Sequence, residues 1–175
     1  GEVQAYFGFM RCDENMESFN VELFEDITLP LPSKINEPTI FQSGDDFTVY
    51  FRSSRGEIDF ITTDDNGDSW SDITGTGLPN SSTKIEAITY NDELILALNN
   101  SFRARDNLSI LRGNHLEMET ICYVDKLEGN FEQKSYPSIR IDNSGNIHMV
   151  YSSMARNQQG YRFGNISYAR ITTND

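Results

Sequence analysis

Apolar residues alternate with polar ones in short runs along the chain, and the runs are separated by Gly, Asn, Asp and Ser. Alternation over four to eight residues is typical of strands that have one buried face. No stretch carries a helical stripe of apolar positions over three turns. Eleven Phe, eight Tyr and many Thr and Ile residues add to the preference for strands. The pattern therefore predicts an all-β chain.

The strand pattern repeats three times at a nearly constant spacing. Each unit has a strand, a turn with Asp or Asn, a second strand and then a third. The first strands begin at Glu37, Glu86 and Tyr136, which gives periods of 49 and 50 residues. The third strands are expected at 57–62, 107–112 and 161–170. A period near 50 with about four strands per unit is typical of the blades of a β-propeller.

The repeat divides this single partial domain into units at about 1–35, 36–84, 85–134 and 135–175. With 175 residues, the chain has room for about three four-stranded blades and a partial blade, whereas propellers have roughly four to eight blades. We therefore expect half of a six-bladed propeller, or a small closed ring. Open blade edges are prone to pairing with other strands. They are expected to be covered by residues 3–10 joining the sheet of 136–171, by self-association or by a second fragment.

One polar turn, T-D-D-N-G-D-S-W at residues 63–70, stands out because it ends in the only Trp of the chain. Asp65 can accept hydrogen bonds from backbone N–H groups two residues on, and Gly67 tolerates a positive φ. Trp70 supplies a large apolar anchor. The stretch predicts a hairpin turn held to the core by its aromatic residue. Residues 71–84, with several Gly and Ser, are expected to form a loop between units.

Charge and cysteine content restrict the partners. The net charge of −13 argues against nucleic acid and anionic membranes, and an acidic ligand would need a local group of Arg. No apolar run approaches the roughly 18 residues of a membrane span, and the start of the chain has no signal-peptide pattern. Cys12 and Cys122 are too far apart in the sequence for a zinc motif or a disulfide framework, so no metal or cofactor is expected.

The repeat brings one set of residue types to the ends of the inner strands. These residues are Glu37, Glu86 and Tyr136 at the first strands, and Arg52, Asn99, Arg103 and Arg105 at or after the ends of the second strands. In a propeller the first strand of each blade lines the centre, so the set is expected to open on one face. Arg guanidinium groups match a carboxylate geometrically, and the set therefore predicts a site for an anionic ligand.

The polar turn fits an Asp box, the pattern Ser/Thr, any residue, Asp, any, Gly, any, Ser/Thr, Trp/Phe. The five matching positions are Thr63, Asp65, Gly67, Ser69 and Trp70. Around it, in order, are E-P-T at 37–39, Arg52, the segment 99–108 with Arg105, and S-Y-P-S-I at 135–139. Together these features resemble the second half of a bacterial-type sialidase (neuraminidase) or of a sialidase-like BNR-repeat protein, over about residues 37–153. In that family the Asp box is structural and lies away from the catalytic face.

A decayed copy of the box is expected at Cys12–Phe19, with Glu14, Ser18 and Phe19 at the specified positions. Phe19 precedes Trp70 by 51 residues, which is again the period of the repeat. The two aromatic residues are therefore expected at equivalent outer hairpins of neighbouring units.

The resemblance implies an exo-α-sialidase type of glycoside hydrolase, or its C-terminal half, that cleaves terminal sialic acid from glycans. Tyr136 and Glu37 would form the nucleophilic pair, and Arg52, Arg105 or Arg103, with Asn99, would bind the substrate. A Tyr suits this chemistry because an anionic sugar repels an attacking carboxylate, and Glu37 could accept the phenol proton. The first Arg and the acid Asp of the family have no counterpart in this sequence. The chain alone is therefore not expected to carry a complete sialidase site.

Structural interpretations remain open for the same residues. Glu37 could simply begin a strand, Tyr136 could be a half-buried strand aromatic, and each Arg could pair with a nearby acid: Asp45 or Asp46 for Arg52, and Asp106 or Glu93 for Arg105. His148 is expected to pack within a strand and His115 to lie on a loop surface.

Two other functions fit the same fold. One is a non-catalytic carbohydrate-binding module, and the other is a structural propeller that binds protein. The expected partner of the site is a sialylated or other acidic glycan, and the expected location is secreted, extracellular or periplasmic.

Overall fold

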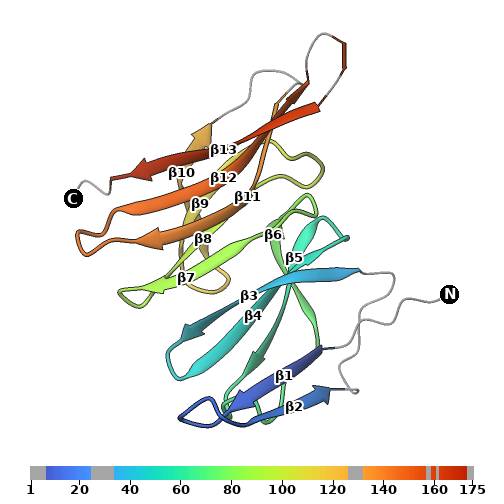
Figure 1. Cartoon of the computed structure of the whole chain (residues 1–175), viewed down its shortest axis with the longest axis vertical. Coiled ribbons are helices and arrows are strands. Elements are labelled where there is room, and N and C mark those ends of the chain that lie inside the picture. Colours follow the sequence, from blue (N-terminus) through green and yellow to red (C-terminus); the bar gives the residue numbers. More distant parts are fainter. Residues whose placement is uncertain (1–6, 25–33, 126–131, 157–158, 161, 173–175) are drawn as a thin grey trace, which may run out of the picture.

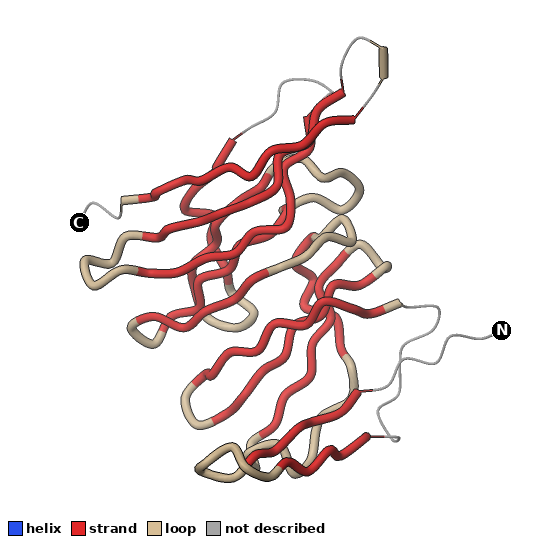
Figure 2. The backbone as a smooth tube through the Cα atoms, in the orientation of Figure 1, coloured by secondary structure: helices blue, strands red, loops and turns tan. Residues whose placement is uncertain are grey.

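The computed structural model describes residues 7–24, 34–125, 132–156, 159–160 and 162–172. Within these ranges the chain consists of strands, turns and loops, without a helix (Figure 2). The strands form four antiparallel sheets of two to four strands. The prediction of an all-β chain is confirmed. No helix that could cross a membrane occurs among these residues.

Each sheet is built from strands that follow one another in the chain (Figure 1). The first sheet pairs β1 (Phe7–Cys12) with β2 (Phe19–Phe24). The second contains β3 (Ile35–Ser43), β4 (Asp46–Ser53), β5 (Glu57–Thr63) and β6 (Thr74–Pro79). The third contains β7 (Glu86–Tyr90), β8 (Glu93–Asn99), β9 (Leu108–Gly113) and β10 (Met118–Asp125). The fourth contains β11 (Glu132–Ile141), β12 (Ile147–Arg156) and β13 (Arg162–Ile171).

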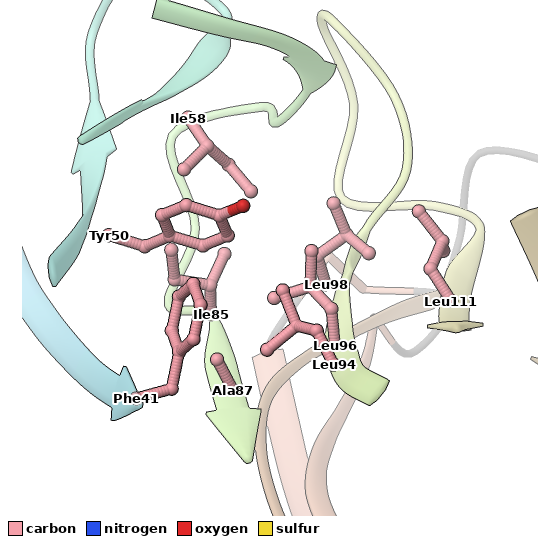
Figure 3. Packing of buried hydrophobic residues seen from close by; sticks show 9 residues of the cluster. All are labelled: Phe41, Tyr50, Ile58, Ile85, Ala87, Leu94, Leu96, Leu98 and Leu111. Atoms are coloured by element: carbon pink, nitrogen blue, oxygen red, sulfur yellow. The ribbon is translucent and has the colours of Figure 1, made fainter. Parts of the chain in front are cut away.

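The third sheet is the central layer of the molecule, and it is apolar on both faces. Along β8, Leu94, Leu96 and Leu98 join a buried cluster with Phe41 and Tyr50 of the second sheet (Figure 3). The alternate residues Ile95 and Ala97 join a second cluster with Ile139, Ile147 and Met149 of the fourth sheet. Successive side chains of a strand point to opposite faces. The unbroken apolar run of β8 therefore reflects packing on both of its sides.

Part of the segment 71–84 is a strand, so its prediction as a loop is wrong. Within it, β6 pairs with β5 through Asp59–Gly75 and Phe60–Thr74, with an irregular register towards Pro79. Glycine and proline weaken a strand signal in the sequence, but they are tolerated in a strand at a sheet edge. Here β6 is the outermost strand of its sheet.

The turn after β5 is held together by Asp65. Its carboxylate accepts hydrogen bonds from the backbone N–H of Ser69 (2.9 Å), from the Ser69 hydroxyl (2.6 Å) and from the Thr63 hydroxyl (2.7 Å). The Asp65 side chain thus accepts from a backbone N–H four residues further along the chain, whereas the sequence predicted a bond two residues further along. Gly67 adopts a φ of 90°, and Trp70 donates to its carbonyl at 3.2 Å. The Trp70 ring packs against the buried cluster of Val49, Phe51, Ile61 and Ile73.

The turn between β1 and β2 uses a different acid from the one expected. Asp13, and not Glu14, accepts from the backbone N–H groups of Glu17 (2.8 Å) and Ser18 (3.1 Å) and from the Ser18 hydroxyl (2.7 Å). This acid stands five residues before its Ser partner, one more than in the turn after β5, so a fixed residue spacing identified the wrong carboxylate. Phe19 is exposed and does not anchor the turn as Trp70 does.

Residues 7–10 belong to β1 and pair only with β2, at the end of the molecule opposite β13 (Figure 1). The expectation that residues 3–10 join the sheet of 136–171 is therefore wrong for 7–10, and residues 3–6 lie outside the described ranges.

His115 was predicted on a loop surface, but it lies among the rings of Phe41, Tyr50 and Phe60, at centroid distances of 6.2, 5.6 and 4.5 Å. The loop between β9 and β10 thus inserts its His between the second and third sheets.

Candidate functional site

Four of the predicted site residues come together from two sheets and from a loop of a third sheet. Arg52 of β4 donates from Nη1 to Glu37 Oε2 of β3 at 2.7 Å, and the same nitrogen lies 3.5 Å from the Tyr136 hydroxyl of β11. The guanidinium of Arg105, from the loop between β8 and β9, lies 5.5 Å from the centre of the Tyr136 ring. This is within the range of a cation–π contact. Glu37 and Tyr136 therefore open on the same face, joined by one guanidinium nitrogen.

Glu37 and Tyr136 share an unusual backbone conformation. Each has a positive φ, 49° and 58° respectively, and each precedes a proline. Each also lies where the strand pairing slips, between Asn36 and Thr39 in one sheet and between Ser135 and Ser138 in the other. A bulge of this kind redirects a side chain. The left-handed conformation costs about 1–2 kcal/mol for a residue other than glycine, and such strain is concentrated at functional sites.

Arg52 is held from both ends of its guanidinium. Its Nε donates to the hydroxyl of Ser82 at 3.2 Å, opposite the contact with Glu37. Partial burial disfavours its charge, but the hydrogen bond and the charge of Glu37 outweigh this effect, so the pKa of Arg52 is raised above its usual value. The side chain is 18% exposed, compared with 33% for Glu37. The alternative pairing of Arg52 with Asp45 or Asp46 does not occur.

Asn99 lies beneath this cluster. Its fully buried side-chain amide donates to the carbonyls of Lys134 (2.7 Å) and Asp106 (3.2 Å), so it ties the loop of Arg105 to β11. Asn107 closes the base of the same loop by donating to the Asn100 carbonyl at 2.9 Å. Asn99 therefore supports the site from below, and its burial keeps it out of reach of a ligand in solvent.

The two Arg candidates of the loop between β8 and β9 differ in position. Arg105 is half-buried over Tyr136, while Arg103 is exposed and has no contact with Tyr136 in the described part of the chain. Glu93, the alternative partner of Arg105, pairs instead with Arg112 at the other end of the third sheet. The path of the loop thus selects Arg105 for the cluster.

Sequence reasoning missed two residues that shape the site, Ser82 and Lys84. Lys84 Nζ donates to Glu86 Oε2 at 2.7 Å and to the carbonyl of Pro137 at 2.8 Å, directly after Tyr136. Glu86, the third member of the repeat position, is thereby engaged in an ion pair and supports the Tyr136 bulge. Ser82 and Lys84 lie in a Gly- and Ser-rich connection that carries no sequence signal for a site.

The cluster combines two guanidinium groups with a carboxylate and a partly exposed phenol. Such a group can hold a ligand carboxylate beside the Tyr136 hydroxyl. Among the described residues no three His, Cys, Asp or Glu side chains are placed to hold a metal ion. An open hollow of about 290 Å³ lies at the other end of the strands, lined by residues such as Gln42, Gly44 and Asp92, and contains none of the cluster residues.

Solved structures with the same fold include three sialidase-type enzymes. An intramolecular trans-sialidase of Ruminococcus gnavus, in complex with oseltamivir carboxylate, is 17% identical (TM-score 0.66; 95% of this chain and 38% of that chain). The NanB sialidase of Streptococcus pneumoniae is 16% identical (TM-score 0.68; 96% and 27%). A Trypanosoma rangeli sialidase in complex with the inhibitor DANA is 12% identical (TM-score 0.62; 96% and 27%). At these identities the likeness concerns the fold, and the chain spans about a quarter to two fifths of those structures' length.

The chain is thus an all-β module with a fold similar to part of these sialidase-type structures. The sequence profile of the BNR repeat-like domain matches residues 25–149, which is more than half of the chain. The chain therefore belongs to the BNR repeat-like domain family, and the predicted resemblance to BNR-repeat proteins is confirmed. A comparison with curated proteins gave no match.

Proposed function

We propose that this chain forms the part of a sialidase-type β-propeller that carries the nucleophile pair and the carboxylate clamp. The observation that carries the proposal is the convergence of Glu37, Arg52, Arg105 and Tyr136 from separate strands and a loop. The sheets β3–β6 and β7–β10 correspond to complete four-stranded blades. The sheets β11–β13 and β1–β2 correspond to incomplete ones, as in half of a six-bladed ring.

The substrate proposed for this site is a terminal sialic acid or another acidic sugar on a glycan, encountered outside the cell. Its carboxylate would bind Arg52 and Arg105, which compensate its charge where the acidic protein as a whole would repel it. Arg52 is suited to this role because contacts on two sides already hold its guanidinium in place. A preorganised Arg loses little side-chain freedom when the ligand binds.

Tyr136 is proposed as the nucleophile. Its phenol oxygen would bond to the anomeric carbon while the bond from that carbon to the leaving-group oxygen breaks. The phenol proton would pass to Glu37 as the general base. The leaving group also needs a proton, and this comes from an acid outside the four-residue cluster. Arg52 links Glu37 and Tyr136 in this structure, and the contact between the Glu37 carboxylate and the Tyr136 hydroxyl would tighten when the ligand binds, as catalytic contacts often do.

Binding of oseltamivir carboxylate, the ligand of the Ruminococcus gnavus structure, tests the clamp. By calorimetry, Arg52→Ala is expected to weaken binding roughly tenfold to hundredfold, the scale of a hydrogen bond between charged groups. Arg112→Ala is the matched control, since Arg112 pairs with Glu93 away from the site, and it should leave the dissociation constant unchanged. Equal affinities of wild type and Arg52→Ala would rule out the clamp.

The chemistry is tested with a fluorogenic sialoside and the protein in its catalytically complete form. Tyr136→Phe should abolish turnover and keep the affinity for the carboxylate ligand. If Tyr136→Phe turned over the sialoside at the wild-type rate, Tyr136 could not be the nucleophile.

A non-catalytic carbohydrate-binding module is the second candidate. It is favoured by the contact of the Glu37 carboxylate, which is made to Arg52 and not to the Tyr136 hydroxyl. A module of this kind would bind the ligand through Arg52 but show no turnover in any form of the protein.

A further inference from the structure

The two ends of the stack of sheets expose apolar faces. At one end, Val150, Ile166 and Tyr168 lie on the outer face of β12 and β13, because Val150 pairs with Tyr168 and Ile166 stands two residues away. We term these three residues the β13 face. Ile166 is 78% exposed, and no described residue covers this face. The opposite face of the same sheet is buried against the third sheet.

At the other end, β1 and β2 expose a second apolar face, termed the β1 face. It comprises Met10, Cys12, Phe19 and Val21, because Met10 pairs with Val21 and Cys12 with Phe19. Phe19 is 63% exposed. The neighbouring residue Arg11 points to the other side of this sheet, where it pairs with Asp68 of the turn after β5. The β1 face is therefore turned away from the rest of the molecule.

The two faces carry opposite charges at their margins. Arg162 and Arg170 share the outer side of β13 with Ile166 and Tyr168, because the pairing with β12 runs without a register shift. The turn beside the β1 face carries exposed acids: Asp13, Glu14 and Glu17. In a chain with 27 acidic residues and 14 Lys or Arg, an exposed strand face with two Arg is distinctive. The β13 face therefore complements the β1 face in polarity and in charge.

We propose that the β13 face of one chain binds the β1 face of a second copy. Each contact would continue the stacking through apolar sheet faces that already joins the second, third and fourth sheets. Pairing of like faces is disfavoured, because two β13 faces would bring Arg162 and Arg170 of both chains together. In a pair joined head to tail, one β13 face and one β1 face stay free. These two faces either bind each other, which closes a ring of two copies, or bind further copies. The proposal does not depend on what the Tyr136 site binds. Further blades of the same polypeptide packed on these two faces would exclude it, and the mass in solution would then be that of one chain.

Cross-linking through Cys12 tests which faces meet. In a Cys122→Ser background, Cys12 is the only thiol of the chain. This protein is mixed with one that carries Cys12→Ser, Cys122→Ser and Ile166→Cys, and a short bismaleimide linker is added. A covalent heterodimer is expected. Ile40→Cys in place of Ile166→Cys is the matched control, since Ile40 is exposed on β3 outside both faces, and it should give little product. Equal yields of heterodimer with Ile166→Cys and with Ile40→Cys, or cross-linking of Cys12 to Cys12, would overturn the proposal.

Mass in solution gives an independent test. Light scattering of the wild-type chain is expected to give at least twice the mass of one chain, falling on dilution. Ile166→Asp should raise the dissociation constant at least about tenfold, the effect of a central interface residue, whereas Ile40→Asp should not. Unchanged circular dichroism would show that both variants fold. A monomeric wild type, or equal effects of the two substitutions, would refute the contact.

Discussion

Replacing Tyr50 with Phe tests the junction that joins the second and third sheets. The Tyr50 side chain is fully buried, in edge contact with Phe41. Its hydroxyl donates to the His115 carbonyl and lies 3.0 Å from His115 Nδ1. A hydroxyl donates once and accepts through its lone pairs, so both contacts are satisfied when Nδ1 carries the ring proton. Burial also raises the pKa of Tyr50, so the group is a neutral donor under all ordinary conditions.

The substitution keeps the ring and removes only the oxygen, so the apolar packing of Figure 3 is retained. The loss has two parts: the net contribution of a hydrogen bond, about 0.5–1.5 kcal/mol, and the penalty for leaving the His115 groups without their partner. Because His115 is only half-buried, water can replace part of what is lost. We therefore expect Tyr50→Phe to lower the free energy of unfolding by about 1–2 kcal/mol.

Urea denaturation followed by Trp70 fluorescence measures this difference, since Trp70 is the only Trp and packs in the second sheet. Tyr123→Phe is the control, because Tyr123 is exposed, and it should change the free energy of unfolding by less than about 0.5 kcal/mol. A double-mutant cycle with His115→Ala should give a coupling energy above about 0.5 kcal/mol. Equal effects of Tyr50→Phe and Tyr123→Phe, or strictly additive effects in the cycle, would refute the proposed junction.

Three further outcomes are expected. Burial lowers the pKa of His115 in the folded protein. Its contribution to stability is therefore complete above the unfolded pKa of about 6.5 and is lost as the pH falls below that value. The urea midpoint of the wild type should drop more between pH 7.5 and 5.5 than that of His115→Gln. Asp65→Ala should lower the urea midpoint, whereas the control Asp64→Ala should not. Asp65→Ala should leave the ligand affinity unchanged, because the turn lies at the opposite end of β4 from Arg52. A change in affinity without a change in stability would contradict this placement. Leu96→Ala in the central sheet should cost about 2–5 kcal/mol in urea unfolding, and a loss below about 1 kcal/mol would show that β8 is not buried on both faces.

Much of the fold was predictable because its signals are local. A strand shows as alternation of period two, a hairpin as a turn residue with a side chain that bonds its own backbone, and a repeated unit as the same pattern about 50 residues later. The predicted third strands match β5, β9 and β13 closely. The strand β6 was missed because an edge strand with Gly and Pro resembles a loop in the sequence.

The sequence predicted which residue types lie at the strand ends, but not the geometry in which they meet. Equivalent repeat positions pointed to Glu37 and Tyr136, which the structure brings to one guanidinium of Arg52. The choice between Arg103 and Arg105 could not be made from the sequence, because it depends on how a loop closes. Asn99 and Arg52 end equivalent strands, yet Asn99 is buried because another sheet packs over it.

The sequence by itself determined the class of structure, the order and approximate bounds of most strands, and the set of charged and phenolic residues at the strand ends. Only the tertiary structure decided which of those residues meet, where the strand register slips, and which aromatic rings surround His115. The physical reason is the range of the interactions. Backbone pairing and turn bonds act over a few neighbouring residues, whereas burial and contact depend on segments that are up to 84 positions apart, as between Arg52 and Tyr136.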